Sequence, residues 1–307
     1  MPFKNTRVDR VLEKVSIGYF PEGFISHLIG TPVPVMKRSG IFGSYGNSHL
    51  QLLNTIVQDR GGYKVVPSIE RSVDNKYYLG KHGLVDFVTE EDKEEVEDPF
   101  DAQQDSVLYL KSLLSIEREY AVSFLLTQIG TYESSNVQTL SGTSQFNDYS
   151  NSNPLEVFAA ARAGVQGSSG VIADTAIMDY RVMTTLIGHP QLTTAQGSSP
   201  FTPLSLESLK RALDVKNILI SHAQYVDSNG DRQSFFGNNI IFYNQASSQM
   251  KRQSTFIYRL ENKKRNERVT IKDANDLVNS ERVFLDMMYQ YKIGTQGAGY
   301  LIQNAIA

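Results

Sequence analysis

The clearest pattern of apolar positions lies between residues 99 and 129. Apolar side chains recur there at intervals of three and four, the spacing of one face of a helix, at Leu110, Leu113, Leu114, Ile116, Tyr120, Ala121, Phe124 and Leu125. Asp98-Pro99 precedes the pattern and Gly130 follows it, as a helix start and stop should. About 30 residues at about 1.5 Å each predict a helix of roughly 45 Å, which is typical of a flat or extended body.

The first 80 residues are less regular. Val8, Val11, Leu12 and Val15 predict a short helix, after which Pro21, Gly23 and Gly30 break the pattern. A piece this short cannot bury its apolar side alone, so it must dock on its own chain or on another. Residues 31–80 mix extended runs with glycines, and residues 63–69 alternate around a proline, as in an edge strand or an exposed hairpin. This region predicts a long loop with a function of its own.

The second half predicts an α/β unit inside a larger chain. Residues 131–153 are rich in Ser, Thr, Asn and Gln and predict loops or strands with turns. Asn153-Pro154 then begins a helix that ends in the glycines of residues 164–170. Further helices are predicted over residues 178–187 and 204–213, and strands over 171–173, 217–220, 240–243, 269–271 and 283–288. The apolar residues 298–304 are expected to pack into the body.

Composition sets limits on the class of protein. The chain has 307 residues, of which 40% are hydrophobic and 21% charged, enough apolar material for a core. It contains no cysteine, which excludes disulfides, thiolate metal sites and cysteine nucleophiles. No run of 18 apolar residues occurs, and the first residues lack the apolar segment of a signal peptide, so we expect neither a membrane helix nor secretion.

Charge is spread unevenly along the chain. The net charge is −3, but residues 90–98 (EEDKEEVED) form a strongly acidic run and residues 259–268 (RLENKKRNER) a basic one. Each run is most simply a solvated loop or helix end. The alternative is complementary contact between neighbouring copies of the chain. The candidate contact residues are Glu90, Glu91, Glu94, Glu95, Lys263, Lys264, Arg265 and Arg268.

The sequence contains no convincing catalytic, cofactor or metal site. The glycines of residues 164–170 leave a helix instead of entering one, and no Lys-Ser or Lys-Thr follows, which argues against phosphate binding. The five histidines are scattered, and none has a partner at metal-ligand spacing. No G-x-S-x-G nucleophile motif occurs. We therefore predict no enzyme, no cofactor and no metal.

The order of these elements and several short motifs resemble the major capsid proteins of tailed bacteriophages, which have the Hong Kong 97 fold. The resemblance covers nearly the whole chain. It rests on residues 77–84, 98–101, Arg118-Glu119, Ala121, 141–146, 153–155, 171–190, 213–220 and 298–302. Each motif alone is weak, and their order and spacing carry the specificity.

The resemblance implies an α+β fold of four parts. Residues 1–36 would be an N-terminal arm draped over a neighbour, and residues 37–80 an extended loop reaching across the adjacent subunit. Residues 81–154 and 245–290 would form a peripheral domain around the spine helix 99–129, meeting its copies at threefold junctions. Residues 155–244 and 291–307 would form an axial domain around fivefold and sixfold axes. Removing residues 1–30 would then leave a soluble fold that no longer closes shells.

The resemblance also implies a function. The chain would form homo-hexamers and homo-pentamers of an icosahedral head that encloses double-stranded DNA. Its partners would be itself, a portal, scaffolding or decoration proteins, and DNA through non-specific contacts that Lys263, Lys264, Arg265 and Arg268 could make. It would assemble in the host cytoplasm and reside in the virion, without a membrane. Two alternatives stay open: a shell protein of the same fold around an enzyme cargo, and an unrelated enzyme or ligand-binding domain.

Overall fold

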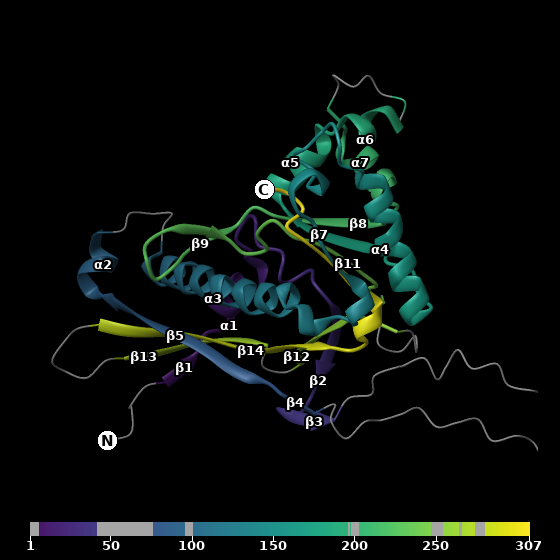
Figure 1. Ribbon diagram of the computed structural model, residues 1–307. Coiled ribbons are helices and arrows are strands. Elements are labelled where there is room, and N and C mark those ends of the chain that lie inside the picture. The colour runs from purple at the N-terminus through teal and green to yellow at the C-terminus, as the bar shows by residue number, and fades with distance from the viewer. Residues whose placement is uncertain are drawn as a thin grey trace, which may run out of the picture.

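The chain folds around two β-sheets, one beneath the long helix α3 and the other among the shorter helices (Figure 1). The computed structural model describes residues 6–41, 76–95, 101–195, 197, 203–246, 254–263, 266–273 and 280–307. Each sheet has a hydrophobic core of its own, and a third, smaller apolar cluster lies on the far face of the first sheet. The architecture is α+β, with the two bodies linked by chain crossings after residue 243 and after residue 293.

The first sheet contains six strands, and β14 is its centre. β5 pairs antiparallel with one edge of β14, and β13 and β12 pair antiparallel with the other edge, one after the other. β1 continues the sheet from β13, and β2 continues it from β12 in parallel. The strands are β1 (Thr6–Val8), β2 (Thr31–Val35), β5 (Gly80–Thr89), β12 (Ile257–Asn262), β13 (Glu267–Asp273) and β14 (Ser280–Ile293).

The predicted spine helix is confirmed as α3 (Ala102–Thr127), which lies along one face of this sheet. Asp101 caps its first turn by accepting hydrogen bonds from two backbone N–H groups. Its buried face differs from the apolar pattern that predicted it. Leu113, Tyr120 and Phe124 are exposed, because the side facing the sheet also carries serines and charged residues.

The second sheet has the order β6-β15-β11-β7-β8, and helices cover it. The predicted strand 171–173 is wrong by a few residues, because those residues approach β7 (Thr175–Asp179) without pairing. The predicted helix 178–187 accordingly begins later, at α5 (Tyr180–Ile187), where Asp179 provides the cap. The other elements are β6 (Val137–Thr139), β8 (Asn217–Ser221), β11 (Ile240–Tyr243), β15 (Gly299–Gln303), α4 (Pro154–Ser169), α6 (Pro190–Ala195) and α7 (Leu206–Leu213).

Residues 137–152, assigned to the peripheral domain from the sequence, lie against the second sheet instead. β6 pairs in parallel with β15, and the Phe146 N–H donates to the Ala305 carbonyl at 2.7 Å. Leu140 and Phe146 are buried in the core of that sheet. The polar composition of this stretch hid the few apolar residues that fix it there.

Residues 6–35 pack on their own chain, whereas the sequence assigned residues 1–36 to an arm draped over a neighbour. α1 (Arg10–Gly18) buries Leu12 against β13 and α3, and Asp9 caps it. Ile25 and Ile29 enter the main core. Because Leu12, Ile25 and Ile29 fill the core and β1 extends the first sheet, removing residues 1–30 would damage the fold itself.

The base of the predicted extended loop is a two-stranded stem. β3 (Ser39–Ile41) pairs antiparallel with β4 (Lys76–Tyr78), so that Ile41 lies opposite Lys76. Residues 42–75, which include the predicted strand 63–69, lie outside the described residues. A separate hairpin, β9 (Gln224–Val226) with β10 (Arg232–Ser234), extends from the second sheet over α3, where Tyr225 contacts Tyr120 edge-on.

Substituting Ile29 tests whether the N-terminal segment belongs to the core. Ile29 is fully buried, whereas its neighbour Leu28 is 47% exposed. We expect Ile29→Ala to lower the free energy of unfolding by about 2–5 kcal/mol through the cavity that it leaves. Leu28→Ala is the matched control and should change it by less than about 0.5 kcal/mol. Urea unfolding followed by circular dichroism measures both, and equal small effects would contradict this packing.

Candidate inter-subunit surfaces

The acidic run lies on a short exposed helix at one end of the first sheet. β5 leads directly into α2 (Glu90–Glu95), which has no buried residue. Thr89 and Asp92 cap its start through reciprocal hydrogen bonds of 2.7 and 3.1 Å. Lys93 pairs with Glu90 at 2.9 Å and with Glu281 of β14 at 3.3 Å. Within the described chain, Glu91, Glu94 and Glu95 have no ion pair, so their charge is available to another molecule.

The basic candidates lie farther along the sheet. Lys263 is exposed just after β12, and its N–H donates to the Val35 carbonyl at 2.9 Å. Arg268 is half-buried on β13, opposite Asp286 of β14. Lys264 and Arg265 lie outside the described residues. Two of the four basic candidates therefore lie on or next to strands of the first sheet, the sheet whose strand β5 leads into the acidic helix α2.

The described candidates of opposite charge, Glu90, Glu91, Glu94 and Glu95 against Lys263 and Arg268, do not form ion pairs within one chain. Thr89, just before α2, is opposite Ser280, whereas β13 begins opposite Met287. Seven residues of β14 separate these points, which is roughly 23 Å at about 3.3 Å per residue. Pairing between α2 and the start of β13 would therefore have to join different copies.

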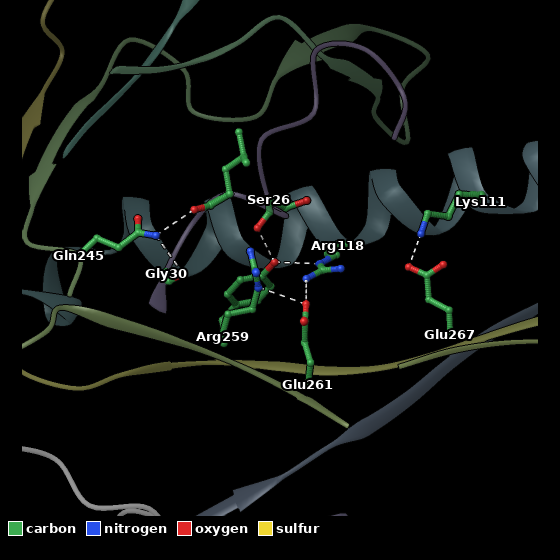
Figure 2. Close-up of polar contacts among 10 residues, drawn as sticks. Ser26, Gly30, Lys111, Arg118, Gln245, Arg259, Glu261 and Glu267 are labelled. Atoms are coloured by element: carbon green, nitrogen blue, oxygen red, sulfur yellow. Dashed lines mark hydrogen bonds and ion pairs between the residues drawn. The ribbon is translucent and has the colours of Figure 1, made fainter. Parts of the chain in front are cut away.

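Sequence reasoning missed a set of charged residues buried between α3, the sheet and the N-terminal segment (Figure 2). Arg118 donates to Glu261 Oε1 at 2.6 Å and to the Tyr291 hydroxyl at 2.8 Å. The Tyr291 hydroxyl in turn donates to the Ser26 carbonyl at 2.8 Å. Arg259 forms an ion pair with the same Glu261 at 3.1 Å. One connected set of contacts thus joins the helix, β12, β14 and the N-terminal segment.

Two further buried charges hold the same segment. The Glu119 carboxylate accepts the backbone N–H of Ser26 at 2.7 Å and that of Ile25 at 3.1 Å. Lys111 forms an ion pair with Glu267, whose other oxygen accepts the Ser16 hydroxyl at 2.9 Å. Because a buried charge without a partner is very costly, these contacts fix where residues 16–26 can lie.

A glutamine fixes the end of the segment at the junction of the two bodies. Gln245 Nε2 donates to the carbonyls of Leu28 and Gly30, each at 3.2 Å. Its Oε1 accepts the Tyr243 hydroxyl at 2.9 Å. Gly30 has a φ of +81°, and an added Cβ would lie 3.2 Å from the Ile257 carbonyl, so glycine suits this close approach.

Burial and neighbouring charges together shift the pKa values of the residues in this cluster. Burial lowers the pKa of Lys111, although Glu267 opposes the shift. Burial raises the pKa of Glu119 in spite of the two backbone donors. For Arg118, burial acts to lower the pKa, but Tyr291 and Glu261 outweigh it and the pKa is raised. Burial also lowers the pKa of His27, as do the cations Arg118, Arg259 and Lys111 around it.

A sequence signal for these residues exists. Val107, Leu110, Leu114 and Val122 mark the buried stripe of α3, and Lys111 and Arg118 fall at intervals of three and four within it. A cation in the middle of an apolar stripe predicts a buried partner of opposite charge. The spacing gives no hint that the partners come from β12 and β13.

A hollow of about 900 Å³ bears on the alternative of an enzyme. Its lining includes two carboxylates, each engaged in a structural contact. Asp174 accepts the backbone N–H of Gln245 at 2.9 Å, and Asp214 pairs with Arg162 at 2.9 Å. Among the described residues, no cluster of three potential metal ligands occurs. In the same part of the chain, no helix is long and apolar enough to cross a membrane.

Solved structures identify the fold. A phage-related protein from Bordetella bronchiseptica RB50 has a TM-score of 0.79 and 17% sequence identity, with 98% of each chain covered. The capsid of cyanophage P-SCSP1u has a TM-score of 0.59 and 10% identity, covering 93% of this chain and 89% of that one. An encapsulin complex from Synechococcus elongatus PCC 7942 has a TM-score of 0.56 and 11% identity, covering 94% and 90%. The chain has the Hong Kong 97-like capsid fold, as the motifs predicted.

A sequence relative narrows the class. The major capsid protein of Burkholderia phage BcepMu is 26% identical over 238 residues, which are 76% of this chain and 75% of that protein. No family model matches the chain. The resemblance to phage major capsid proteins is confirmed.

Removing the charge of Lys111 tests the buried cluster. Lys111→Met leaves the Glu267 carboxylate buried without its cation, and we expect the free energy of unfolding to fall by about 3–5 kcal/mol. Lys111→Met combined with Glu267→Leu should be less destabilised than the single variant, because no unpaired charge remains. Lys210→Met, which breaks the exposed pair with Glu207, is the control and should have no measurable effect. Additive effects of the two core substitutions would contradict the pairing.

Acidification should weaken the fold through His27. In the unfolded chain histidine titrates near pH 6.5, and the folded pKa is lower, so stability falls as the pH drops below about 6.5. Above that pH both states are neutral and His27 contributes nothing. We expect the fall in melting temperature between pH 7.5 and 5.5 to be smaller in His27→Gln. Identical pH profiles for the two proteins would show that His27 is not responsible.

Proposed function

We propose that the chain assembles into hexamers and pentamers of an icosahedral phage head that encloses double-stranded DNA. The observation that carries the proposal is the similarity to capsid structures along nearly the whole chain, together with the phage major capsid protein among its sequence relatives. Subunits that form closed shells have surfaces complementary to other copies of the same chain. The absence of a catalytic constellation from the sequence agrees with a structural role.

The surfaces support this proposal physically. Large apolar side chains are exposed on α1 and α3, on the edge strand β5 and on the stem of the extended loop, among them Val11, Phe87, Tyr109, Phe124 and Tyr78. Exposed apolar patches of this kind mark interaction sites in soluble proteins. An edge strand as long as β5 also exposes unpaired backbone groups that invite another chain. Neighbours in a shell would cover both.

The remaining partners follow from the same proposal. A head needs a portal for DNA entry, and separate scaffolding or decoration proteins would act during or after assembly. Contacts with DNA would be non-specific and electrostatic, and Lys263, Lys264, Arg265 and Arg268 are the residues proposed for them. The protein would assemble in the host cytoplasm and remain in the virion. Residues 37–80 would reach across the adjacent subunit.

A second candidate is a shell that encloses an enzyme cargo in a cell. The observation in its favour is the similarity to the Synechococcus elongatus encapsulin complex, which covers almost as much of the chain as the cyanophage capsid does. The contents of purified particles separate the two functions. Nuclease-protected double-stranded DNA with a portal supports the phage head, and a copurifying enzyme supports the nanocompartment.

Electron microscopy of the purified protein tests the proposal directly. We expect closed, uniform particles built of hexamers and pentamers. Smaller oligomers should also be present, because the particles form from them. A species that stays monomeric in sedimentation at all protein and salt concentrations would contradict a shell function.

Deleting residues 42–75 tests the role of the extended loop. Because Ile41 lies opposite Lys76 in the stem, an Asn-Gly turn can join the two strands without disturbing their register. We expect the shortened chain to keep its melting temperature and to form no closed particles. A variant with a Gly-Ser segment of the same length in place of residues 42–75 controls for chain length. Normal particles from either variant would show that the loop is not required.

A further inference from the structure

The first sheet has a second face, opposite α3, that is only partly covered. Side chains alternate between the faces along each strand, so Val283, Leu285 and Met287 lie under α3 and their neighbours point the other way. At one end of this second face, Tyr77 and Leu79 of the loop stem pack on β12 and β14. At the other end, near α2, no helix or strand of the described residues covers the sheet (Figure 1).

The uncovered end has an apolar centre. Val85 of β5 lies opposite Phe284 of β14, and Phe87 lies opposite Arg282. Val85 is 42% and Phe87 54% exposed. Large apolar side chains that are exposed side by side on a sheet are typical of a surface that another molecule covers. Val8 of β1 continues the same row across β13 and is also exposed.

Basic side chains surround this apolar centre. Among the described residues they are Lys81, Arg268, Lys272 and Arg282, and Asp286 lies among them and pairs with Lys81 at 2.8 Å. The cations rest on the aromatic rings: Lys272 Nζ is 4.7 Å from the Phe284 ring centre, and Arg282 Cζ is 5.2 Å from that of Phe87. We call these seven residues (Lys81, Val85, Phe87, Arg268, Lys272, Arg282 and Phe284) the basic sheet face.

The charge of the basic sheet face decides what can cover it. Two copies placed face to face would bring like charges together, which excludes a symmetric contact between identical faces. The partner must be acidic. In the described chain, the exposed acids Glu117, Asp214 and Glu207 pair with His82, Arg162 and Lys210, and other exposed acids such as Glu22, Glu133 and Asp231 lie far apart in the sequence. α2 holds five acidic residues and one lysine, and Glu91, Glu94 and Glu95 have no ion pair among the described residues.

We propose that the basic sheet face of one subunit binds the acidic helix α2 of a neighbouring copy. The inference rests on the proposed self-assembly and names the contact that carries part of it. α2 follows β5 directly, and Phe87, Lys272 and Arg282 of the basic sheet face lie at that end of the sheet, so each copy both offers a helix and receives one. A head-to-tail contact of this kind closes into a ring where the rotation between successive copies completes a circle.

The same face could attract the phosphates of DNA, and its composition argues for protein. Aromatic rings and arginines around an apolar centre are typical of protein interfaces. Cations lying on rings also extend less far than the lysines and arginines that usually reach for a phosphate backbone. Glutamate side chains of a helix would approach the cations at close range, while their methylene groups cover Phe87 and Phe284.

Charge exchange tests the pairing. One variant carries Glu94→Lys and Glu95→Lys, a second carries Arg268→Glu and Lys272→Glu, and a third combines all four substitutions. We expect each of the first two to slow particle formation, measured by light scattering, by at least about tenfold, and the third to recover to within about threefold of the wild type. Circular dichroism and urea midpoints confirm that each variant folds.

A matched control lies on the opposite side of the sheet. Arg10→Glu with Lys14→Glu reverses two exposed basic residues of α1, and we expect it to assemble at the wild-type rate. If this control slows assembly, and combining it with Glu94→Lys and Glu95→Lys restores the rate, then α2 binds α1 of the neighbouring copy. That result would overturn the proposal. Anisotropy of a labelled double-stranded oligonucleotide measures DNA binding, and loss of that binding in the second variant with normal assembly would assign the face to DNA.

The outcomes distinguish a failure of this contact from a failure of the proposed shell function. If the wild type forms particles and the first two variants do so equally fast, this contact is wrong and the shell function stands. If the two variants are slow and the combined variant stays slow, the pairing is also wrong. If the wild type forms no particles under any condition, the proposed function fails, and the contact proposed within it fails too.

Discussion

Buried charge on one helix, α3, organises the body around the first sheet of this protein. Lys111, Arg118 and Glu119 lie on the side of α3 that faces the sheet and the N-terminal segment, where water cannot solvate them. Each therefore needs a partner in a fixed position, and the partners come from β12, β13, β14 and the backbone near Ser26. Apolar burial alone would tolerate sliding of the helix, whereas these directional contacts allow one register.

This constraint explains why residues 6–30 are part of the body around the first sheet. Their backbone satisfies Glu119, their hydroxyl groups and carbonyls complete the Arg118 and Lys111 contacts, and their apolar residues fill the core beneath α3. The N-terminal segment and α3 are therefore held to the first sheet by both apolar and polar contacts.

The two faces of the peripheral sheet accordingly differ in role. One face is closed by α3 and α1 and contributes stability within the chain. The other is closed only at the loop stem, and its uncovered end combines apolar and basic side chains. In one copy the uncovered end of the sheet has no covering element among the described residues, and α2 has unpaired glutamates. Under the proposed contact, each would be covered by another copy.

Sequence alone determined the elements whose signals are local: the spine helix with its Asp-Pro start, the helix that begins at Asn153-Pro154, the strands β8, β11, β13 and β14, and the resemblance to capsid proteins carried by motif order. It also located the acidic run that includes α2 and indicated that its glutamates are solvated, because charge density is visible without tertiary context. Only the tertiary structure decided that the N-terminal segment docks on its own chain, that residues 137–152 join the second sheet, and that Lys111 and Arg118 are buried. The physical reason is that those outcomes depend on partners more than a hundred residues away, and the pairing of distant charges and strand edges leaves no periodic trace in the segments themselves.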